Sequence, residues 1–289
     1  MRYGKGIRGM TAVLLLCVLF FVPVGAEPVP GRDFGPEVPG IPEQTEGEYA
    51  LDELPEAPDQ DAEEAEAEAA EEAVGEATAG RLSGLIIGID PGHQAEGNYD
   101  KEPVAPGSKK TKAKVSSGTK GRKTQIPEHE VNLQVSLKLR DALAAEGARV
   151  IMVREVAEVD ISNIERATMM NDAGADLVLR IHCNGANSPK PKGMSVYVRK
   201  TGTKAAESRE AARCVLEGML ETTGAQDRGV VRSNDYSGLN WSEVPSMLIE
   251  MGFLTNPEEE QLLISGEYQD KLVEGMVEGV AAFFEIRNS

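Results

Sequence analysis

The sequence predicts a three-layer αβα domain with a central, mostly parallel, twisted sheet of about five or six strands. Two observations support this α/β fold class. Between residues 82 and 286, short runs rich in β-branched residues alternate with stretches of helical periodicity, a pattern typical of layered α/β folds. In addition, two of the stretches that follow these runs begin with residues suited to cap a helix, which favours helices alternating with the strands.

Five short apolar runs are expected to form the strands. They are Leu85–Ile89, Arg149–Val153, Leu177–Ile181, Met194–Val198 and Ser246–Glu250. Between and after them, apolar residues recur at three- and four-residue steps, which indicates amphipathic helices. The clearest of these helical stretches are Val131–Leu143, Ala212–Leu220 and Leu272–Phe284.

Two further helices are predicted from the chemistry of their first turns. Ser162 is followed three residues later by Glu165, which fits a capping box. Asn256 is followed by Pro257 and then by Glu259, which supplies an N-cap, a proline at the first helical position and a glutamate able to reach back. Helices are therefore expected to begin near residues 163 and 257.

The N-terminus has the features of a secretion signal. Three basic residues precede an apolar stretch from Met10 to Val22, and Ala26 closes a run of small residues. We therefore expect residues 1–26 to be a signal peptide that is cleaved after Ala26, so that the mature protein is secreted. An uncleaved membrane anchor is the alternative, but the apolar stretch is shorter than the roughly 20 residues that a membrane span needs.

Most of the net charge of −18 lies in the segment that follows. Residues 27–80 contain 18 acidic residues and one basic residue, with many prolines early and a Glu/Ala tract later. Such a composition predicts a disordered linker, here residues 27–81. The remaining residues, 82–289, suit one folded domain, expected to be a monomer. They are nearly balanced in charge, which does not favour a nucleic-acid partner.

Only Cys183 and Cys214 remain after removal of the signal peptide. Two cysteines are too few for the disulfide framework of a small exported domain, so the core must depend on ordinary apolar burial. A bridge between them and two buried thiols are both compatible with the sequence.

Two of the three histidines stand where predicted strands end. His93 follows Leu85–Ile89 after three intervening residues, and His182 directly follows Leu177–Ile181. A single histidine at a strand end is more often structural than catalytic. Two of them, combined with suitable carboxylates, point to a site at the ends of the strands.

Four segments carry a family resemblance. In chain order they are Gly88–His93 (GIDPGH), Glu128 four residues before Asn132-Leu133, Arg180–Asn184 (RIHCN) and Pro245–Asn256 (PSMLIEMGFLTN). Each segment alone is weak evidence, but the ordered set is specific and spans nearly the whole folded region. It resembles the four sequence blocks of the zinc-dependent N-acetylmuramoyl-L-alanine amidases of the Amidase_3 type, which are cell-wall hydrolases.

The resemblance implies an enzyme with one zinc ion per chain, bound by His93, Glu128 and His182, and with Glu250 as the catalytic carboxylate. Three protein ligands and an open fourth position are what a catalytic zinc site requires. The implied substrate is peptidoglycan or a muropeptide, cut between the lactyl group of muramic acid and L-alanine, outside the membrane in the cell wall. A zinc peptidase or carboxypeptidase acting on wall peptides and a non-catalytic peptidoglycan-binding module are the alternatives.

Glu128 is the ligand with a direct competitor. It lies in the run Glu128-His129-Glu130, in which each residue could bind zinc. The family's spacing to Asn132 favours Glu128, and His129 is then expected to face solvent. Glu250 ends an apolar strand, where partial desolvation is expected to raise its pKa and make it a better base.

The chain departs from the simplest family pattern between the first two implied ligands. Gln94 stands where a glycine is common, and 34 residues, Gln94–Pro127, separate His93 from Glu128. Within this insert, residues 109–123 carry seven basic residues and no acidic one. The insert is interpreted either as a solvated surface loop or as a basic arm that binds peptide carboxylates or anionic wall polymers.

Overall fold

The computed structural model describes residues 80–289, and the predicted signal peptide and nearly all of the predicted linker lie outside this range. Six strands form one sheet in the order β4-β1-β5-β8-β6-β7. Their bounds are β1 Ile86–Pro91, β4 Arg149–Met152, β5 Leu177–Asn184, β6 Met194–Arg199, β7 Asp227–Ser233 and β8 Ser246–Phe253. All neighbouring strands are parallel except β6 and β8. The predicted mostly parallel sheet is confirmed.

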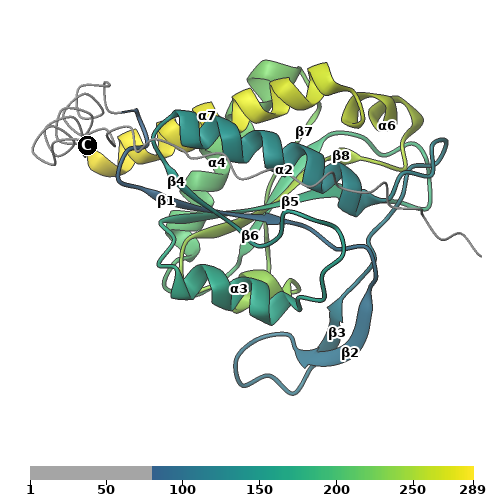
Figure 1. Cartoon of the computed structure of the whole chain (residues 1–289), viewed down its shortest axis with the longest axis horizontal. Coiled ribbons are helices and arrows are strands. Elements are labelled where there is room, and N and C mark those ends of the chain that lie inside the picture. The colour runs from purple at the N-terminus through teal and green to yellow at the C-terminus, as the bar shows by residue number, and fades with distance from the viewer. Residues whose placement is uncertain (1–79) are drawn as a thin grey trace, which may run out of the picture. The chain divides into compact units, whose positions relative to one another are not determined.

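Helices cover both faces of this sheet, which completes the predicted three layers. The helices are α2 Glu128–Ala145, α3 Asn163–Asp172, α4 Ala205–Thr223, α5 Ser237–Asn240, α6 Pro257–Leu263 and α7 Gly266–Asn288. Figure 1 shows α2 and α7 above the sheet and α3 below it. The larger buried cluster joins the sheet to α2, α4 and α7, and a smaller one joins it to α3. Among residues 80–289, no helix is both long and apolar enough to cross a membrane.

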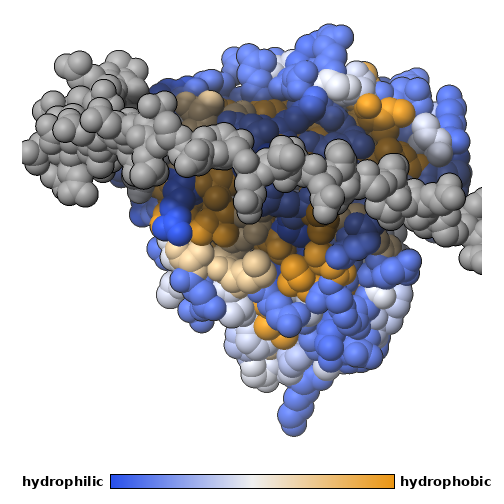
Figure 2. Space-filling view, in the orientation of Figure 1, coloured by the Kyte–Doolittle hydropathy of each residue, from blue (hydrophilic) through white to orange (hydrophobic). Residues whose placement is uncertain are grey.

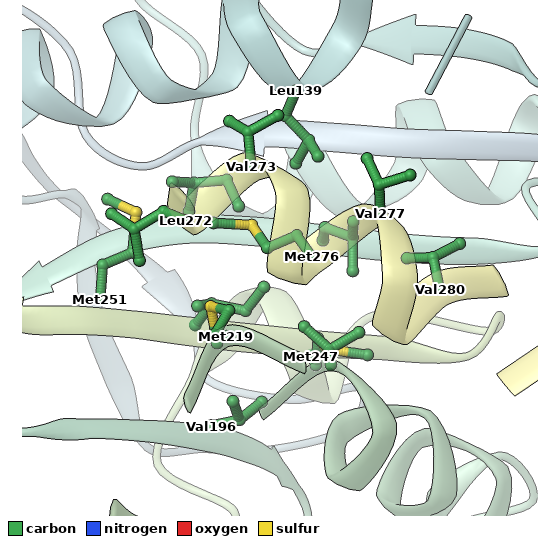
Figure 3. Packing of buried hydrophobic residues seen from close by; sticks show 14 of the residues in the cluster. Leu139, Val196, Met219, Met247, Met251, Leu272, Val273, Met276, Val277 and Val280 are labelled. Carbon is green, nitrogen blue, oxygen red and sulfur yellow. The ribbon is translucent and has the colours of Figure 1, made fainter. Parts of the chain in front are cut away.

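The main core lies around α7. Figure 3 shows Met276 and Val277 of α7 packed among apolar side chains, with Leu139 of α2 on one side and Met219 and Met247 on the other. Close approach of α4 and α7 depends on glycine, because a Cβ on Gly279 would lie 2.4 Å from the Cα of Val215. The two helices therefore touch through their backbones, with no side chain between them.

The predicted helix starts are correct, but one capping detail is wrong. Ser162 and Glu165 form the complete capping box of α3, and the Asn256 side chain accepts bonds from the first turn of α6. Glu259 does not reach back to its own N-cap. Its two carboxylate oxygens accept hydrogen bonds from the backbone amides of Gly193 (2.7 Å) and Phe253 (2.6 Å) instead, because the end of β8 and the start of β6 pass beside this helix.

The insert was expected to be either a loop or a basic arm, and part of it is a two-stranded antiparallel sheet. Strand β2 is Asn98–Pro103 and β3 is Thr111–Val115. The hairpin projects at the lower right of Figure 1, and Figure 2 shows mainly hydrophilic residues at this end of the domain. It is anchored to the domain by the indole of Trp241, which donates to the carbonyl of Pro103 (2.9 Å).

Cys183 and Cys214, the two cysteines within residues 80–289, are buried free thiols. Cys183 follows His182 on β5, and since side chains alternate along a strand, its thiol enters the main core on the opposite face. The question that the sequence left open is thus answered in favour of two thiols.

Candidate active site

Three side chains from distant parts of the chain converge at the carboxyl edge of the sheet. His93 follows β1, Glu128 is the first residue of α2, and His182 lies near the end of β5. Nε2 of His93 and Nδ1 of His182 each lie 3.2 Å from Oε1 of Glu128. One ligand atom from each residue lies within 4.8 Å of the other two. The three residues are therefore close enough to share one metal ion.

The orientation of His93 is fixed by the insert. Its Nδ1 donates to the carbonyl of Ser116 (2.7 Å), which turns Nε2 toward Glu128. The backbone of His93 has φ of 61°, a region that a residue with a side chain rarely occupies. This strain is compatible with a site that requires one orientation of the ring.

Glu128 is held from both sides. Oε2 accepts a hydrogen bond from the amide of Thr119 (2.8 Å), and Oε1 accepts from the amide of Cys183 (3.1 Å) and from the side chain of Asn132 (3.3 Å). Burial would raise the pKa of Glu128, but the two imidazoles outweigh it and hold the pKa well below its ordinary value. The carboxylate is therefore ionised and fixed before any ligand arrives.

Two glycines leave room for these ligands. A Cβ on Gly92 would lie 2.2 Å from Cε1 of His182, and a Cβ on Gly118 would lie 2.7 Å from Oε2 of Glu128. Neither position can carry a side chain without displacing a member of the group.

The expectation that His129 faces solvent is wrong. Its side chain is buried, and the neighbouring segment packs against this turn of α2 because Arg154 donates to the carbonyl of His129 (2.9 Å). Burial lowers the pKa of His129, and among residues 80–289 its Nδ1 has no hydrogen-bond partner. His129 is nevertheless not a member of the converging group, whereas Glu128 is.

Glu250 lies beside this group on the neighbouring strand. In the parallel pairing of β5 with β8, Glu250 is the register partner of His182. Its Oε2 is buried and has no hydrogen-bond partner within the described residues. Burial, and secondarily the charge of Glu128, raises the pKa of Glu250 well above its ordinary value. The carboxyl group is thus suited to take up a proton.

These residues lie in a cleft of about 860 Å³. Its lining includes Tyr236 and Asn184, together with Lys112, Lys120 and Arg122 of the insert. Tyr236 lines this cleft, whereas the nearby Leu239 is buried and the indole of Trp241 is bonded to the hairpin.

Beside the ligands lies a buried charge cluster that was not among the predicted site residues. Asp90 lies between Arg166 (2.7 Å) and Arg180 (2.8 Å), and all three side chains are nearly sealed from solvent. The available signal was the presence of Asp90 and Arg180 within otherwise apolar strands. A charge in a buried strand requires a partner, and that requirement alone could have indicated the cluster.

The folded domain matches a known protein family. Residues 87–282 match the sequence profile of the Amidase_3 family, described as N-acetylmuramoyl-L-alanine amidase. The chain belongs to this family. Its activity is that of an amidase, which hydrolyses the bond between the muramic acid lactyl group and L-alanine, as the resemblance implied.

This chain is similar to individual amidases over most of its length. It is 30% identical to the N-acetylmuramoyl-L-alanine amidase Rv3717 of Mycobacterium tuberculosis, over 72% of this chain and 89% of that protein. It is 29% identical to the amidase LytC of Bacillus subtilis over 73% of this chain, but spans only 39% of the length of LytC. A crystal structure of an amidase from Clostridium difficile 630 is 32% identical, covers 70% of this chain and 97% of its own, and has a TM-score of 0.59.

Proposed function

We propose that this amidase uses one zinc ion, bound by His93, Glu128 and His182, to cut peptidoglycan or its muropeptide fragments. The observation that carries the proposal is the convergence of two imidazole nitrogens and a carboxylate oxygen within 4.8 Å. This donor set fits zinc, which takes nitrogen and oxygen ligands and, in catalytic sites, three protein ligands. The ring of His93 is oriented with Nε2 toward Glu128, and the ionised carboxylate of Glu128 is already in the form that a metal requires.

A zinc ion in this site would polarise the scissile carbonyl and lower the pKa of a water molecule toward about 7. The protein supplies the proton transfer. Glu250, beside His182 and with a free carboxylate oxygen, takes the proton of the attacking water and delivers it to the leaving amine of L-alanine. Asn132 and the amides of Thr119 and Cys183 hold Glu128 in place meanwhile.

Removal of the Glu250 carboxylate tests the proton transfer. We expect Glu250→Gln to reduce hydrolysis by at least about a hundredfold, because general acid–base catalysis contributes about 10²–10⁴ in rate, while one zinc per chain remains bound. Mass spectrometry of digested wall fragments measures the release of intact stem peptides. Glu130→Gln, an exposed acid in the first turn of α2, is the matched control and should retain the parent rate. Digestion by Glu250→Gln at the parent rate would refute the role of Glu250.

The same products separate the amidase from the alternative reactions. Stem peptides that are released intact from the glycan support the proposed bond. Shortened stems would instead show a peptidase or carboxypeptidase, and the absence of any product from the zinc-loaded parent protein would favour a binding module.

Metal analysis tests the ligands. We expect His93→Ala and Glu128→Ala to lose the zinc that the parent protein binds, whereas His129→Ala should keep about one zinc per chain. His129 is a demanding control because it adjoins Glu128 and is equally capable of binding zinc. Loss of zinc from His129→Ala together with full zinc content in Glu128→Ala would reverse the assignment.

We also propose that the enzyme acts outside the cytoplasmic membrane after cleavage following Ala26. The basic n-region, the apolar stretch and the small residues before Glu27 support this export. N-terminal sequencing of protein recovered from the culture medium is expected to begin at Glu27. Recovery of the full-length chain from the membrane fraction would indicate the uncleaved anchor instead.

A further inference from the structure

Three arginines are buried below the proposed metal ligands, and two of them have no free donor nitrogen. Arg166 bonds through Nε to Ile161, through Nη1 to Asp90, and through Nη2 to His93 and Gln94. Arg154 likewise engages all three nitrogens with backbone carbonyls. These two side chains hold the backbone that carries His93.

Arg180 differs from them. It is 4% exposed, yet only its Nη2 has partners, Asp90 at 2.8 Å and Asn163 at 3.3 Å. Among residues 80–289, Nε and Nη1 of Arg180 form no hydrogen bond. Neither nitrogen is completely sealed from solvent. Since Arg180 lines the cleft, its unused donors are open to the cleft. A buried guanidinium with unmatched donors indicates a ligand that accepts them.

The charge around Arg180 is also unmatched. The single carboxylate of Asp90 is shared by two guanidinium groups, Arg166 and Arg180. Glu102 is the other nearby acid, but it forms no ion pair with Arg180 within the described residues. The cluster of Asp90, Arg166 and Arg180 therefore retains one positive charge for an anion in the cleft.

The position of Arg180 relates it to the scissile bond. It lies two residues before His182 on β5, so both side chains leave the same face of the sheet about 7 Å apart. The backbone of Gly238 lies directly against the guanidinium, because a Cβ there would be 2.1 Å from Cζ of Arg180. The group is thus held at a fixed distance from the proposed metal site.

We propose that Arg180 binds a carboxylate on the peptide half of the substrate, carried by the residue that follows L-alanine. This inference rests on the proposed function. The lactyl carboxyl group is the acyl half of the scissile amide, so a free carboxylate of the substrate must come from the peptide half. Two residues of peptide span about 7 Å, which matches the separation of Arg180 from His182.

The test uses two soluble substrates that differ in one group. Both are N-acetylmuramoyl-L-alanyl-D-glutamates whose γ-carboxyl group is blocked as an amide, with the α-carboxylate either free or converted to the carboxamide. We expect the wild-type enzyme to prefer the free carboxylate by about ten- to a hundredfold in kcat/KM, as for a hydrogen bond to a charged group. Arg180→Met should bring this ratio close to one. Equal rates of the wild type on both substrates would overturn the proposal.

Two further variants serve as controls for effects on the ratio that do not come from Arg180. Gly238→Ala keeps every charge but must displace the guanidinium, so it should also reduce the ratio. Lys112→Met removes a different positive charge that lines the cleft and should leave the ratio as it is. Loss of the preference in Lys112→Met but not in Arg180→Met would assign the carboxylate to the insert and refute the role of Arg180.

A binding measurement separates this proposal from the proposed function. If the wild-type enzyme cleaves neither substrate, the proposed reaction fails, and calorimetry with the two released dipeptides still tests Arg180. Tighter binding of the free carboxylate by the wild type than by Arg180→Met supports the subsite. Equal binding of the two dipeptides by the wild type refutes it.

Discussion

Asp90 shows how a single residue supports the site from below. It is completely buried, and its two oxygens meet Arg166 and Arg180. Arg166 in turn donates to the carbonyl of His93 (3.0 Å). The position of a proposed metal ligand therefore depends on a carboxylate three residues earlier in the chain.

Removal of the charge of Asp90 should destabilise the folded state. We expect Asp90→Asn to lower the free energy of unfolding by about 3–5 kcal/mol, because it leaves buried guanidinium groups without their partner. Urea unfolding at pH 7 measures this change. Asp270→Asn breaks an exposed ion pair with Lys138 and should cost at most about 1 kcal/mol. Equal effects of the two substitutions would contradict the argument.

The contribution of Asp90 should also depend on pH. Burial would raise its pKa, but Arg180 and Arg166 outweigh it and lower the pKa from 3.8 to about 2. A carboxylate whose pKa is lower in the folded state stabilises the fold fully above its unfolded pKa and loses this contribution as the pH falls. The difference in unfolding free energy between the parent protein and Asp90→Asn should thus be constant above about pH 5 and shrink between pH 4 and pH 2. A difference that does not change over that range would show that Asp90 is not the titrating group.

At the scale of single residues, the site residues that could be predicted are those whose position relative to a predicted strand is distinctive. His93, His182 and Glu250 each follow or end an apolar strand, so their meeting at one sheet edge could be predicted. The partners that orient them could not, because the bonds that join His93 to Ser116 and to Arg166 connect distant parts of the chain. The buried state of His129 depends on packing by the segment of Arg154 in the same way.

At the scale of elements, the contact between α4 and α7 is set by glycines. A Cβ on Gly279 would meet the backbone of Val215 at 2.4 Å, and backbone cannot move aside as a side chain can. The helices would have to separate to accommodate it.

We therefore expect Gly279→Ala to destabilise the domain by about 1–3 kcal/mol, the usual cost of overpacking, which exceeds the roughly 1 kcal/mol that alanine gains over glycine within a helix. Thermal or urea unfolding measures this loss of stability. Gly266→Ala, in the first turn of the same helix, meets only the tip of Lys138 at 3.9 Å and should change stability by less than about 0.5 kcal/mol. A stabilised Gly279→Ala variant would show that the helices can separate freely.

Elements buried on their apolar faces were predictable, and the more exposed ones were not. The five apolar runs all form strands of the sheet. Strand β7 was missed because it lies at the sheet edge beside β6, where the sequence Asp227–Ser233 can remain polar and half-exposed. The hairpin of β2 and β3 was missed for the same reason, since most of its residues are lysines and other polar groups without a clear alternating pattern.

At the scale of the whole molecule, charge is divided between two regions. Residues 27–80 are strongly acidic, whereas residues 109–123 of the insert contain seven basic residues and no acidic one. Several of these bases line the cleft. We propose that the basic segment, residues 109–123, attracts anionic wall polymers, an attraction that salt should screen over about 10 Å at 0.1 M.

A sedimentation assay with purified wall tests this attraction. We expect the double variant Lys109→Gln/Lys110→Gln to bind walls that carry anionic polymers several-fold more weakly at low salt, and the difference from the parent protein to vanish at about 1 M salt. Arg209→Gln/Arg213→Gln removes the same charge from α4 as a matched control. Equal weakening by both pairs would indicate a general effect of net charge and not a property of this segment.

Two hydrogen bonds, one from His93 to the carbonyl of Ser116 and one from the amide of Thr119 to Glu128, restrict how the domain can change. Both bonds come from the stretch that joins the hairpin to α2, so the insert is a structural part of the site as well as a lysine-rich surface. Shortening the hairpin at its tip leaves that stretch intact, whereas a cut that reaches residues 116–119 frees one imidazole and one carboxylate together. The tip of the hairpin can therefore vary, in evolution or by design, without loss of the metal site. Residues 116–119 must be kept together with that site.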